Sequence, residues 1–219
     1  MTLVVVKYGG AVSEGAADGI LELAEEYDVC VVHGAGPQIT VEMERRGLPV
    51  TFVGGRRVTS AAALEVVRES LTAVNAQLCA AIGRRAVAVP EGVLDATPVP
   101  ELGLVGDPLP SAPSIVVDAL ELGLIPVVAP LARGPLNVNG DEAAAALAVG
   151  LGADRIIFVT DVPGVLVAGG VAHAIGADEA ERLVGIGAFE GGIVPKLLAA
   201  ARAARGGVPA EIGVTAVTA

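Results

Sequence analysis

The chain contains two lysines, Lys7 and Lys196, although it carries twelve arginines. Arginine is therefore used almost everywhere that a positive charge alone is needed, and lysine is kept at two places. A compact ammonium group can sit against a transferring phosphoryl oxygen, which the planar guanidinium group of arginine does not imitate well. We interpret Lys7 and Lys196 as the two cations of a phosphate-binding site.

Lys7 ends a run of β-branched residues and is followed by Gly9 and Gly10. The run at 4–6 is typical of a strand that is buried on both faces in the middle of a parallel sheet. A charge at the tip of such a strand is costly to bury unless it meets an anion, and glycines let the backbone approach that anion closely. The alternative is an ordinary β-turn with a solvated lysine.

A second glycine loop, His33-Gly34-Ala35-Gly36-Pro37, follows an apolar strand expected at 29–32. A proline in the first turn of the next helix leaves free backbone N–H groups and the positive end of the helix dipole facing an anion. The loop is not a Walker A motif, because no Lys-Ser/Thr pair follows its glycines. Its alternative is a structural βα turn, and His33 alone is typical of a hydrogen-bonded structural histidine rather than a base.

Two later stretches also open helices. Lys196 lies in the first turn of the helix expected after Gly191 and Gly192, where the helix dipole disfavours a cation, and a bound phosphate is the simplest reason for that placement. The run Asn137-Val138-Asn139-Gly140-Asp141 precedes an alanine-rich helix. Taken alone, this run predicts an Asx turn and a helix N-cap.

Apolar strands and amphipathic segments alternate along the chain, which predicts a mostly parallel sheet with helices on both faces, a three-layer αβα sandwich. We expect strands at 4–6, 29–32, 87–89, 125–129, 156–159 and 210–217, and a hairpin within 165–175. We expect helices at 13–26, 37–46, 59–83, 114–123, 141–151 and 193–205.

The net charge of −11 argues against binding to nucleic acid or to anionic membranes. No apolar run reaches the roughly 18 residues that span a bilayer, and no signal peptide is evident at the N-terminus. Cys30 and Cys79 lie among apolar residues, as reduced thiols of a cytoplasmic protein do. The two histidines and two cysteines lack metal-ligand spacing, so no zinc site is expected.

Motifs spread over nearly the whole chain resemble those of the amino acid kinase family, and within it they are most similar to the N-acetylglutamate kinases. These motifs are Lys7–Gly10, His33–Pro37, Gly54–Thr59, Asn137–Asp141, Thr160–Val165 and Gly191–Lys196. The resemblance implies ATP-dependent phosphorylation of the γ-carboxylate of N-acetyl-L-glutamate to an acyl phosphate, a step of arginine biosynthesis. It also implies Mg²⁺ bound chiefly through the phosphates of ATP, with no dense carboxylate cluster for the metal.

The resemblance further implies catalytic roles. Lys7 would stabilise the transferring phosphoryl group, Lys196 would stabilise charge on the leaving ADP, and Asp141 would hold both lysines. Arg57 would pair with the α-carboxylate of the substrate, a task that suits a bidentate guanidinium. For this segment the alternative is a basic hairpin tip, which Arg56 fits better than Arg57.

The remaining implied contacts divide between the two substrates. Substrate binding would also involve Gly34, Ala35, Gly36 and Asn137. The nucleotide would be contacted by Gly9, Gly10, Thr160, Asp161, Val162, Gly164, Val165, Gly191 and Gly192. We expect one structural domain with two lobes, in which residues 1–128 bind the acyl amino acid and form the face of a homodimer, and residues 129–219 bind ATP.

The chain departs from the family pattern at several points. Ala35 stands where the usual loop has a third glycine, and Gly140 replaces an alanine. The C-terminus is expected to end some tens of residues early, and no N-terminal extension of the kind found in hexameric relatives precedes the first strand. Two alternatives stay open: a kinase for another acylated or carrier-linked amino acid such as an aminoadipate, and a non-catalytic sensor of nucleotides or amino acids.

Overall fold

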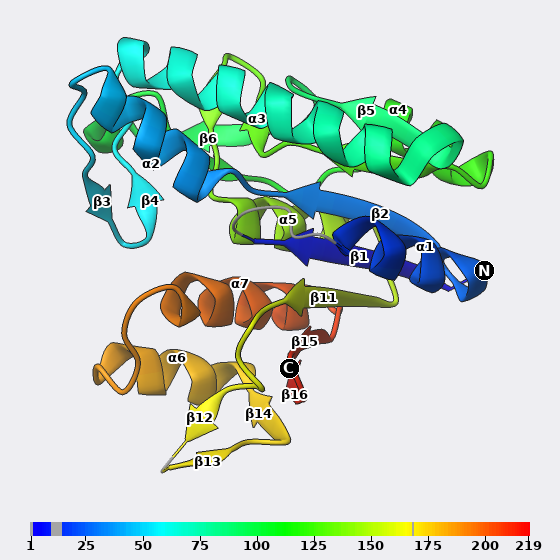
Figure 1. The fold of residues 1–219 in the computed structure, drawn as a ribbon. Coiled ribbons are helices and arrows are strands. Elements are labelled where there is room, and N and C mark those ends of the chain that lie inside the picture. The colour runs from blue at the N-terminus through cyan, green and yellow to red at the C-terminus, as the bar shows by residue number, and fades with distance from the viewer. Residues whose placement is uncertain (1, 10–14, 168) are drawn as a thin grey trace.

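The computed structural model describes residues 2–9, 15–167 and 169–219. The described residues form an eight-stranded sheet in the order β14-β16-β15-β11-β1-β2-β8-β5 (Figure 1). Neighbouring strands are parallel except for the β15–β16 pair, so the predicted mostly parallel sheet is confirmed. The strands are β1 (Leu3–Tyr8), β2 (Asp28–His33), β5 (Ala86–Val89), β8 (Ile125–Val128), β11 (Arg155–Val159), β14 (Ala174–Gly176), β15 (Ala210–Ile212) and β16 (Thr215–Thr218).

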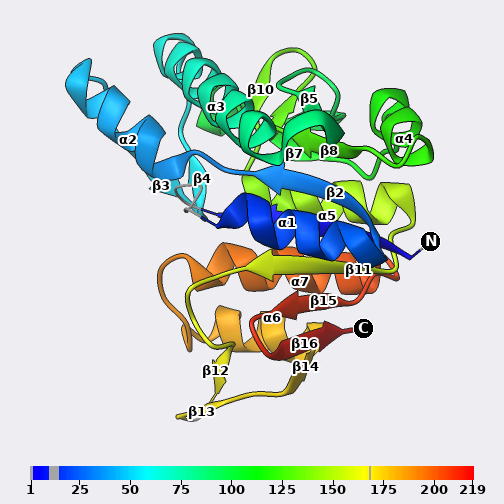
Figure 2. The same ribbon diagram turned by 45° about the vertical axis from the view of Figure 1, so that its right-hand side comes forward.

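Helices cover both faces of this sheet, which confirms the three-layer αβα architecture (Figures 1 and 2). They are α1 (Ala16–Glu26), α2 (Gly36–Arg45), α3 (Ala61–Ile82), α4 (Ser114–Glu121), α5 (Gly140–Leu151), α6 (Ala177–Gly185) and α7 (Ile193–Arg205). Helices α1 and α3 bury apolar side chains such as Ile20 and Leu78 against one face. Helices α4, α5 and α7 pack on the other face, where Leu147 and Leu197 are buried.

Strand β1 lies in the interior of the sheet, as its run of valines predicts. Val4 and Val6 join the core under α1 and α3, whereas Val5 joins the core under α5 and α7. The strand pairs in parallel with β2 and β11, and Lys7 stands opposite Val32 and Phe158. Because the carboxyl ends of parallel strands meet at one edge, the residues that follow β2 and β11 lie beside Lys7.

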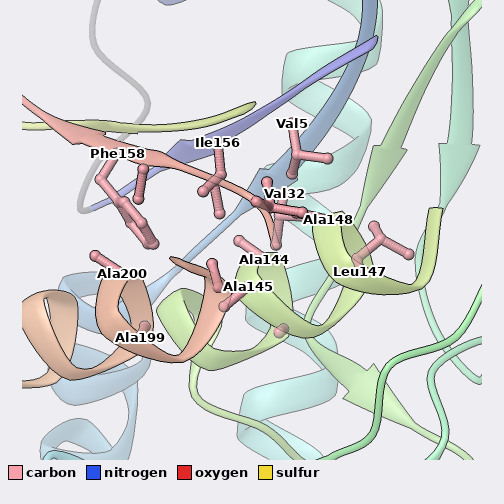
Figure 3. Close-up of a cluster of buried hydrophobic side chains, with 14 of the residues drawn as sticks. Val5, Val32, Ala144, Ala145, Leu147, Ala148, Ile156, Phe158, Ala199 and Ala200 are labelled. Carbon is pink, nitrogen blue, oxygen red and sulfur yellow. The ribbon is translucent and has the colours of Figure 1, made fainter. Parts of the chain in front are cut away.

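An alanine-rich contact joins α5 and α7. Figure 3 shows Ala144, Ala145 and Ala148 of α5 and Ala199 and Ala200 of α7 beneath the apolar side chains of β1, β2 and β11. All five alanines are buried. Side chains this small allow the two helix axes to approach closely, because the distance between packed helices depends on the side chains at their contact.

Short two-stranded ribbons flank the sheet. They are β3 (Phe52–Val53) with β4 (Arg56–Arg57), β6 (Ala96–Pro98) with β7 (Gly106–Pro108), β9 (Leu131–Ala132) with β10 (Leu136–Asn137), and β12 (Leu166–Val167) with β13 (Gly170–Val171). Short 3-10 turns span Gly83–Arg85 and Pro100–Leu102. The β3–β4 ribbon is the hairpin that Gly54 and Gly55 permit, since both have positive φ.

The structure differs from the sequence-based expectation at the last strand and at helix α6. The last strand, expected at 210–217, is an antiparallel pair that turns at Gly213, whose φ is +56°. Helix α6 was not expected. The described part of the first helix begins at Ala16, and the expected start at 13 lies outside the described residues. Within the described ranges, no helix has the length and apolarity needed to cross a membrane.

Candidate active site

Three charged side chains from separate elements meet at the carboxyl edge of the sheet. Lys7 Nζ, at the end of β1, donates to Asp141 Oδ1 at 2.7 Å. Lys196 Nζ, in the first turn of α7, lies 3.4 Å from the same oxygen. The side chains of Lys7, Asp141 and Lys196 are 6%, 11% and 12% exposed, so the cluster is largely shielded from water. Residues separated by 134 and 55 positions are thus brought together as predicted.

The electrostatics of this triad favour the charged form of Asp141. Burial alone would raise the pKa of Asp141, but the two ammonium groups outweigh burial and hold that pKa below its ordinary value. Burial lowers the pKa of Lys196, and the nearby Asp141 carboxylate opposes the shift. Lys196 Nζ also lies 5.5 Å from the centre of the Phe158 ring. One carboxylate between two cations leaves one positive charge uncompensated within the triad, which suits an anionic ligand.

Two clefts open on opposite sides of the triad and share Lys7 and Asp141 in their walls. The smaller has a volume of about 200 Å³, and its wall includes all five residues predicted to bind the acyl substrate: Gly34, Ala35, Gly36, Arg57 and Asn137. The larger has a volume of about 870 Å³ and is lined in part by Gly9, Thr160, Asp161, Val162, Gly192 and Lys196. The predicted substrate and nucleotide residues therefore line different clefts that meet at the triad.

Arg57 is a buried guanidinium in the wall of the smaller cleft. Its Nη2 donates to Thr40 Oγ1 at 2.8 Å and to the Gly36 carbonyl at 3.2 Å. Its guanidinium carbon lies 4.6 Å from the centre of the Phe52 ring. Burial lowers the pKa of Arg57, and no carboxylate among the described residues pairs with it. A buried cation held only by neutral groups is suited to a carboxylate ligand.

Arg56, which fitted the alternative of a basic hairpin tip better than Arg57, lies on the β3–β4 hairpin and is ion-paired there. Arg56 Nε donates to Glu142 at 2.9 and 3.0 Å, and its Nη2 donates to Asp107 Oδ1 at 3.0 Å. Its side chain is 20% exposed. The hairpin itself is present, but both of its arginines have specific partners.

The Asn137–Asp141 run combines a cleft wall with a helix cap. Asn139 caps α5 as the sequence predicts, because its Oδ1 accepts the backbone N–H groups of Asp141 and Glu142 at 2.8 and 3.2 Å. Asn137 Nδ2 donates to the buried Thr59 hydroxyl at 2.9 Å, which fixes the amide in the smaller cleft.

Gly140 and Ala35 are the two departures from the family pattern within the site. A Cβ on Gly140 would lie 2.9 Å from Lys7 Cε, so the lysine side chain passes directly over this glycine. Ala35 has φ −147°, which any residue adopts, and its side chain packs with Ile39 and Met43. The alanine therefore fits the loop without strain.

Some predicted nucleotide residues lie away from the walls of both clefts. Gly164 and Val165 follow the cleft-lining run but pack inward: the Val165 N–H donates to the Thr215 hydroxyl at 2.9 Å, and Val165 is fully buried. Gly191 has φ +68° and forms the turn before α7. Gly10 lies outside the described residues. Contact of these residues with ATP stays a prediction.

A buried polar pair supports the second glycine loop. His33 is fully buried, its Nε2 lies 3.0 Å from Asn75 Nδ2, and burial lowers its pKa to about 4. Asn75 also donates to the Val127 carbonyl at 2.8 Å. The structural role predicted for His33 is confirmed. Asn75 was missed, although a polar residue four positions after Leu71 on an apolar helix face was a visible signal.

The described residues contain no group of three or more His, Cys, Asp or Glu side chains placed to hold a metal ion. The carboxylates that line the larger cleft and could bind a metal ion are those of Asp141, Asp161 and Glu190. Asp141 is engaged by both lysines, so a divalent ion in this cleft would depend largely on oxygens supplied by its ligand.

The parallel sheet, with this lysine–aspartate–lysine triad between two clefts at its carboxyl edge, indicates the class of protein to which the chain belongs. The chain belongs to the amino acid kinase family, whose model matches residues 2–213, and the resemblance inferred from the motifs is confirmed.

Particular relatives narrow the comparison. Acetylglutamate kinase from Rubrobacter xylanophilus is 43% identical, and the match covers 97% of this chain and 88% of that one. Acetylglutamate kinase from a Jannaschia species is 38% identical, with 96% and 81% covered. The solved structure of smu.665 from Streptococcus mutans superposes with a TM-score of 0.89 at 28% identity and covers 99% of this chain and 98% of that one.

Proposed function

We propose that this chain is a kinase that transfers the γ-phosphoryl group of ATP to the γ-carboxylate of N-acetyl-L-glutamate, and relatives that carry the name acetylglutamate kinase support this proposal. The observation that carries the proposal is the pair of clefts that share Lys7 and Asp141. Two substrates bound on either side of these residues would place acceptor and donor next to each other, and such positioning supplies much of the catalysis of phosphoryl transfer.

The bond changes need no general base. A carboxylate oxygen of the substrate attacks the γ-phosphorus, the bond from that phosphorus to the bridging oxygen breaks, and ADP leaves with the electron pair. Because a γ-carboxylate is already ionised near neutral pH, no proton has to be removed. Asp141, engaged by two lysines, is therefore assigned to orientation rather than to proton transfer.

The two lysines divide the developing charge. Lys7 lines both clefts, so its ammonium group is available to the phosphoryl group during transfer. Lys196 lines only the larger cleft and is assigned to the negative charge that builds on ADP. Asp141 holds both ammonium groups before the ligands arrive, which reduces the reorganisation needed at the moment of reaction.

The substrate contacts follow from the smaller cleft. Arg57 is assigned to the α-carboxylate of N-acetyl-L-glutamate and Asn137 to a further polar contact, while Gly34, Ala35 and Gly36 line the cleft that would hold the acceptor. Mg²⁺ enters with ATP and is held mainly by its phosphates. The proposed lobes are 1–128 for the acyl amino acid and 129–219 for ATP. The segment 137–141 belongs to the second lobe, but it lines the smaller cleft, which is assigned to the acyl amino acid.

Two broader expectations stay proposals. We expect a cytoplasmic enzyme. We also expect a homodimer with α3 at its interface, because the outer face of α3 exposes small side chains, including Ala73, Ala76 and Ala80. Sedimentation of the purified chain would report the oligomeric state, and a monomer at micromolar concentration would contradict the dimer.

The test is release of ADP from Mg-ATP with and without N-acetyl-L-glutamate, with the acyl phosphate trapped as its hydroxamate. We expect substrate-dependent turnover that collapses in Lys7→Arg and Arg57→Gln variants, whereas Asp95→Asn, which removes a surface ion pair, keeps it. Turnover only with an acetylated aminoadipate would reassign the substrate. Binding of ATP without turnover on any acyl amino acid would favour the sensor.

A further inference from the structure

Asp107, the middle residue of β7, joins two arginines that belong to different parts of the site. Its Oδ1 accepts Arg56 Nη2 at 3.0 Å and Arg202 Nη1 at 2.7 Å. Arg202 is fixed further, since its Nη2 donates to the Pro108 carbonyl at 2.7 Å. One carboxylate oxygen therefore bridges the β3–β4 hairpin and helix α7.

The same hairpin is tied to the start of α5. Arg56 Nε donates to both oxygens of Glu142, the residue that follows Asp141. The side chains of Arg56 and Glu142 are 20% and 18% exposed, so this pair is largely shielded from water. The four side chains Arg56, Arg202, Asp107 and Glu142 carry two positive and two negative charges, and the network is neutral.

Direct packing accompanies the ion pairs. A Cβ on Gly55, at the hairpin turn, would lie 2.9 Å from Pro195 Cβ, so the turn rests on the residue that precedes Lys196. Asn139 Nδ2 donates to the Gly55 carbonyl at 3.0 Å. The hairpin that carries Arg57 is thus in contact with the first turn of α7.

Chain geometry makes this network a link between the two clefts. Arg56 and Arg57 are neighbours on one strand, so their side chains leave it in opposite directions and move together. Arg57 holds the wall of the smaller cleft beside α2, whereas Arg56 reaches Asp107. Arg202 and Lys196 lie on the same helix about 9 Å apart along its axis. Two ion pairs, both made by Asp107, therefore connect the hairpin at the smaller cleft with helix α7 at the larger cleft.

We infer that Asp107 is a positioning residue that fixes the β3–β4 hairpin against α7 and so couples the binding of the acyl substrate to the binding of ATP. The inference rests on the proposed function for the identity of the two ligands. A ligand that orders one side of the Asp107 link also orders the other, so the second ligand binds to a site that is already arranged. Without the link, each ligand has to order its own side.

The test compares Asp107→Asn, which keeps the size of the side chain but removes its charge, with Asp95→Asn. Asp95 is a matched control because it pairs with Arg133 at 2.8 Å and its side chain is 46% exposed, against 40% for Asp107. Calorimetry measures the affinity for a non-hydrolysable ATP analogue with Mg²⁺, in the presence and absence of saturating N-acetyl-L-glutamate. The ratio of the two affinities is the readout, because a general loss of stability would not change it selectively.

We expect the acyl substrate to tighten nucleotide binding by about fivefold or more in the wild type and in Asp95→Asn. In Asp107→Asn the ratio falls to below about twofold, while the affinity for the analogue alone changes by less than about threefold. Arg202→Gln has the same effect, and the double variant loses no more than either single one. A ratio in Asp107→Asn equal to that of the wild type, or a wild-type ratio of one, would overturn the inference.

Hydrogen–deuterium exchange of the ligand-free protein separates this inference from the proposed function. We expect faster exchange in peptides covering 52–57 and 193–197 in Asp107→Asn than in the wild type or in Asp95→Asn, since the hairpin loses its ion-pair link to α7 and keeps the packing of Gly55 on Pro195. Unchanged exchange in both peptides would show that Asp107 does not hold the hairpin. If the wild type fails to bind N-acetyl-L-glutamate, the proposed substrate is wrong, and the exchange measurement still decides the role of Asp107.

Discussion

Replacing Asp141 by asparagine removes the carboxylate that lies between Lys7 and Lys196 while keeping the shape of the side chain. The backbone N–H of residue 141 still meets the Asn139 cap, so α5 retains its start. The variant therefore tests the charge rather than the fold. The ligand-free site changes from one uncompensated positive charge to two, both in side chains that are no more than 12% exposed.

The distances set the size of the effect. At 2.7 and 3.4 Å, an effective dielectric constant of about 20 gives attractions of about 6 and about 5 kcal/mol. Desolvation of the three groups offsets much of this, and removal of one partner from a buried pair costs about 3–5 kcal/mol. We expect the ligand-free variant to lose about 3 kcal/mol of its free energy of unfolding. Saturating Mg-ATP should recover more than half of the loss, because phosphate oxygens supply the missing anion.

Urea unfolding and steady-state kinetics measure these effects together. We expect kcat to fall by at least about 100-fold, since lysines that repel each other no longer hold the geometry of transfer, while KM for ATP does not rise. Asp95→Asn, which opens an exposed pair, should cost less than about 1 kcal/mol. A variant that unfolds at the wild-type urea concentration, or one that keeps kcat within about threefold of the wild type, would refute the assignment of Asp141 as the residue that holds both lysines.

Three further outcomes are expected. Lys196→Arg should lower kcat by about 100-fold or more, because a planar guanidinium does not reproduce the ammonium group above Phe158; equal turnover of the two proteins would contradict this. Gly164→Ala should lower the free energy of unfolding, measured with urea, by about 1–3 kcal/mol and leave KM for ATP unchanged. The reason is that the added Cβ would lie 2.6 Å from the Thr215 hydroxyl and 2.8 Å from Val171. A stable variant with weakened ATP binding would instead assign Gly164 to the nucleotide. His33 should make stability depend on pH: its pKa is about 4 in the folded protein and about 6.5 unfolded. Its contribution is therefore complete above pH 6.5 and lost as pH falls toward 4, by about 3 kcal/mol in all. Urea unfolding of the wild type should show this slope and His33→Asn should lack it, and parallel slopes would exclude the effect.

Much of the site was visible in the sequence because its residues belong to local patterns. Lys7 ends a valine-rich strand and Lys196 opens a helix after two glycines, and these patterns led to the interpretation of both as cations of one phosphate-binding site. The run that contains Asn139 predicted a helix N-cap. These features depend on backbone periodicity and on residues that are close together along the chain, which a sequence displays directly.

The partners of the remaining side chains were not visible, because they depend on contacts between distant segments. Nothing near Arg56 in the sequence points to Asp107, 51 positions away, so the ion pair that this hairpin residue makes was not predicted. Gly164 and Val165 continue a run whose first residues face a cleft, yet they turn inward against Thr215. Helix α6 was missed, because its short segment carries few apolar positions and depends on packing against α7.

The alanine contact between α5 and α7 links the packing of the interior to the rate of turnover. Asp141 and Lys196 are carried by these two helices, so the closeness of their axes sets whether carboxylate and ammonium can meet. We expect Ala144→Val or Ala200→Val to widen the contact between the two helices and to move Asp141 away from Lys196, and so to slow turnover before any loss of solubility.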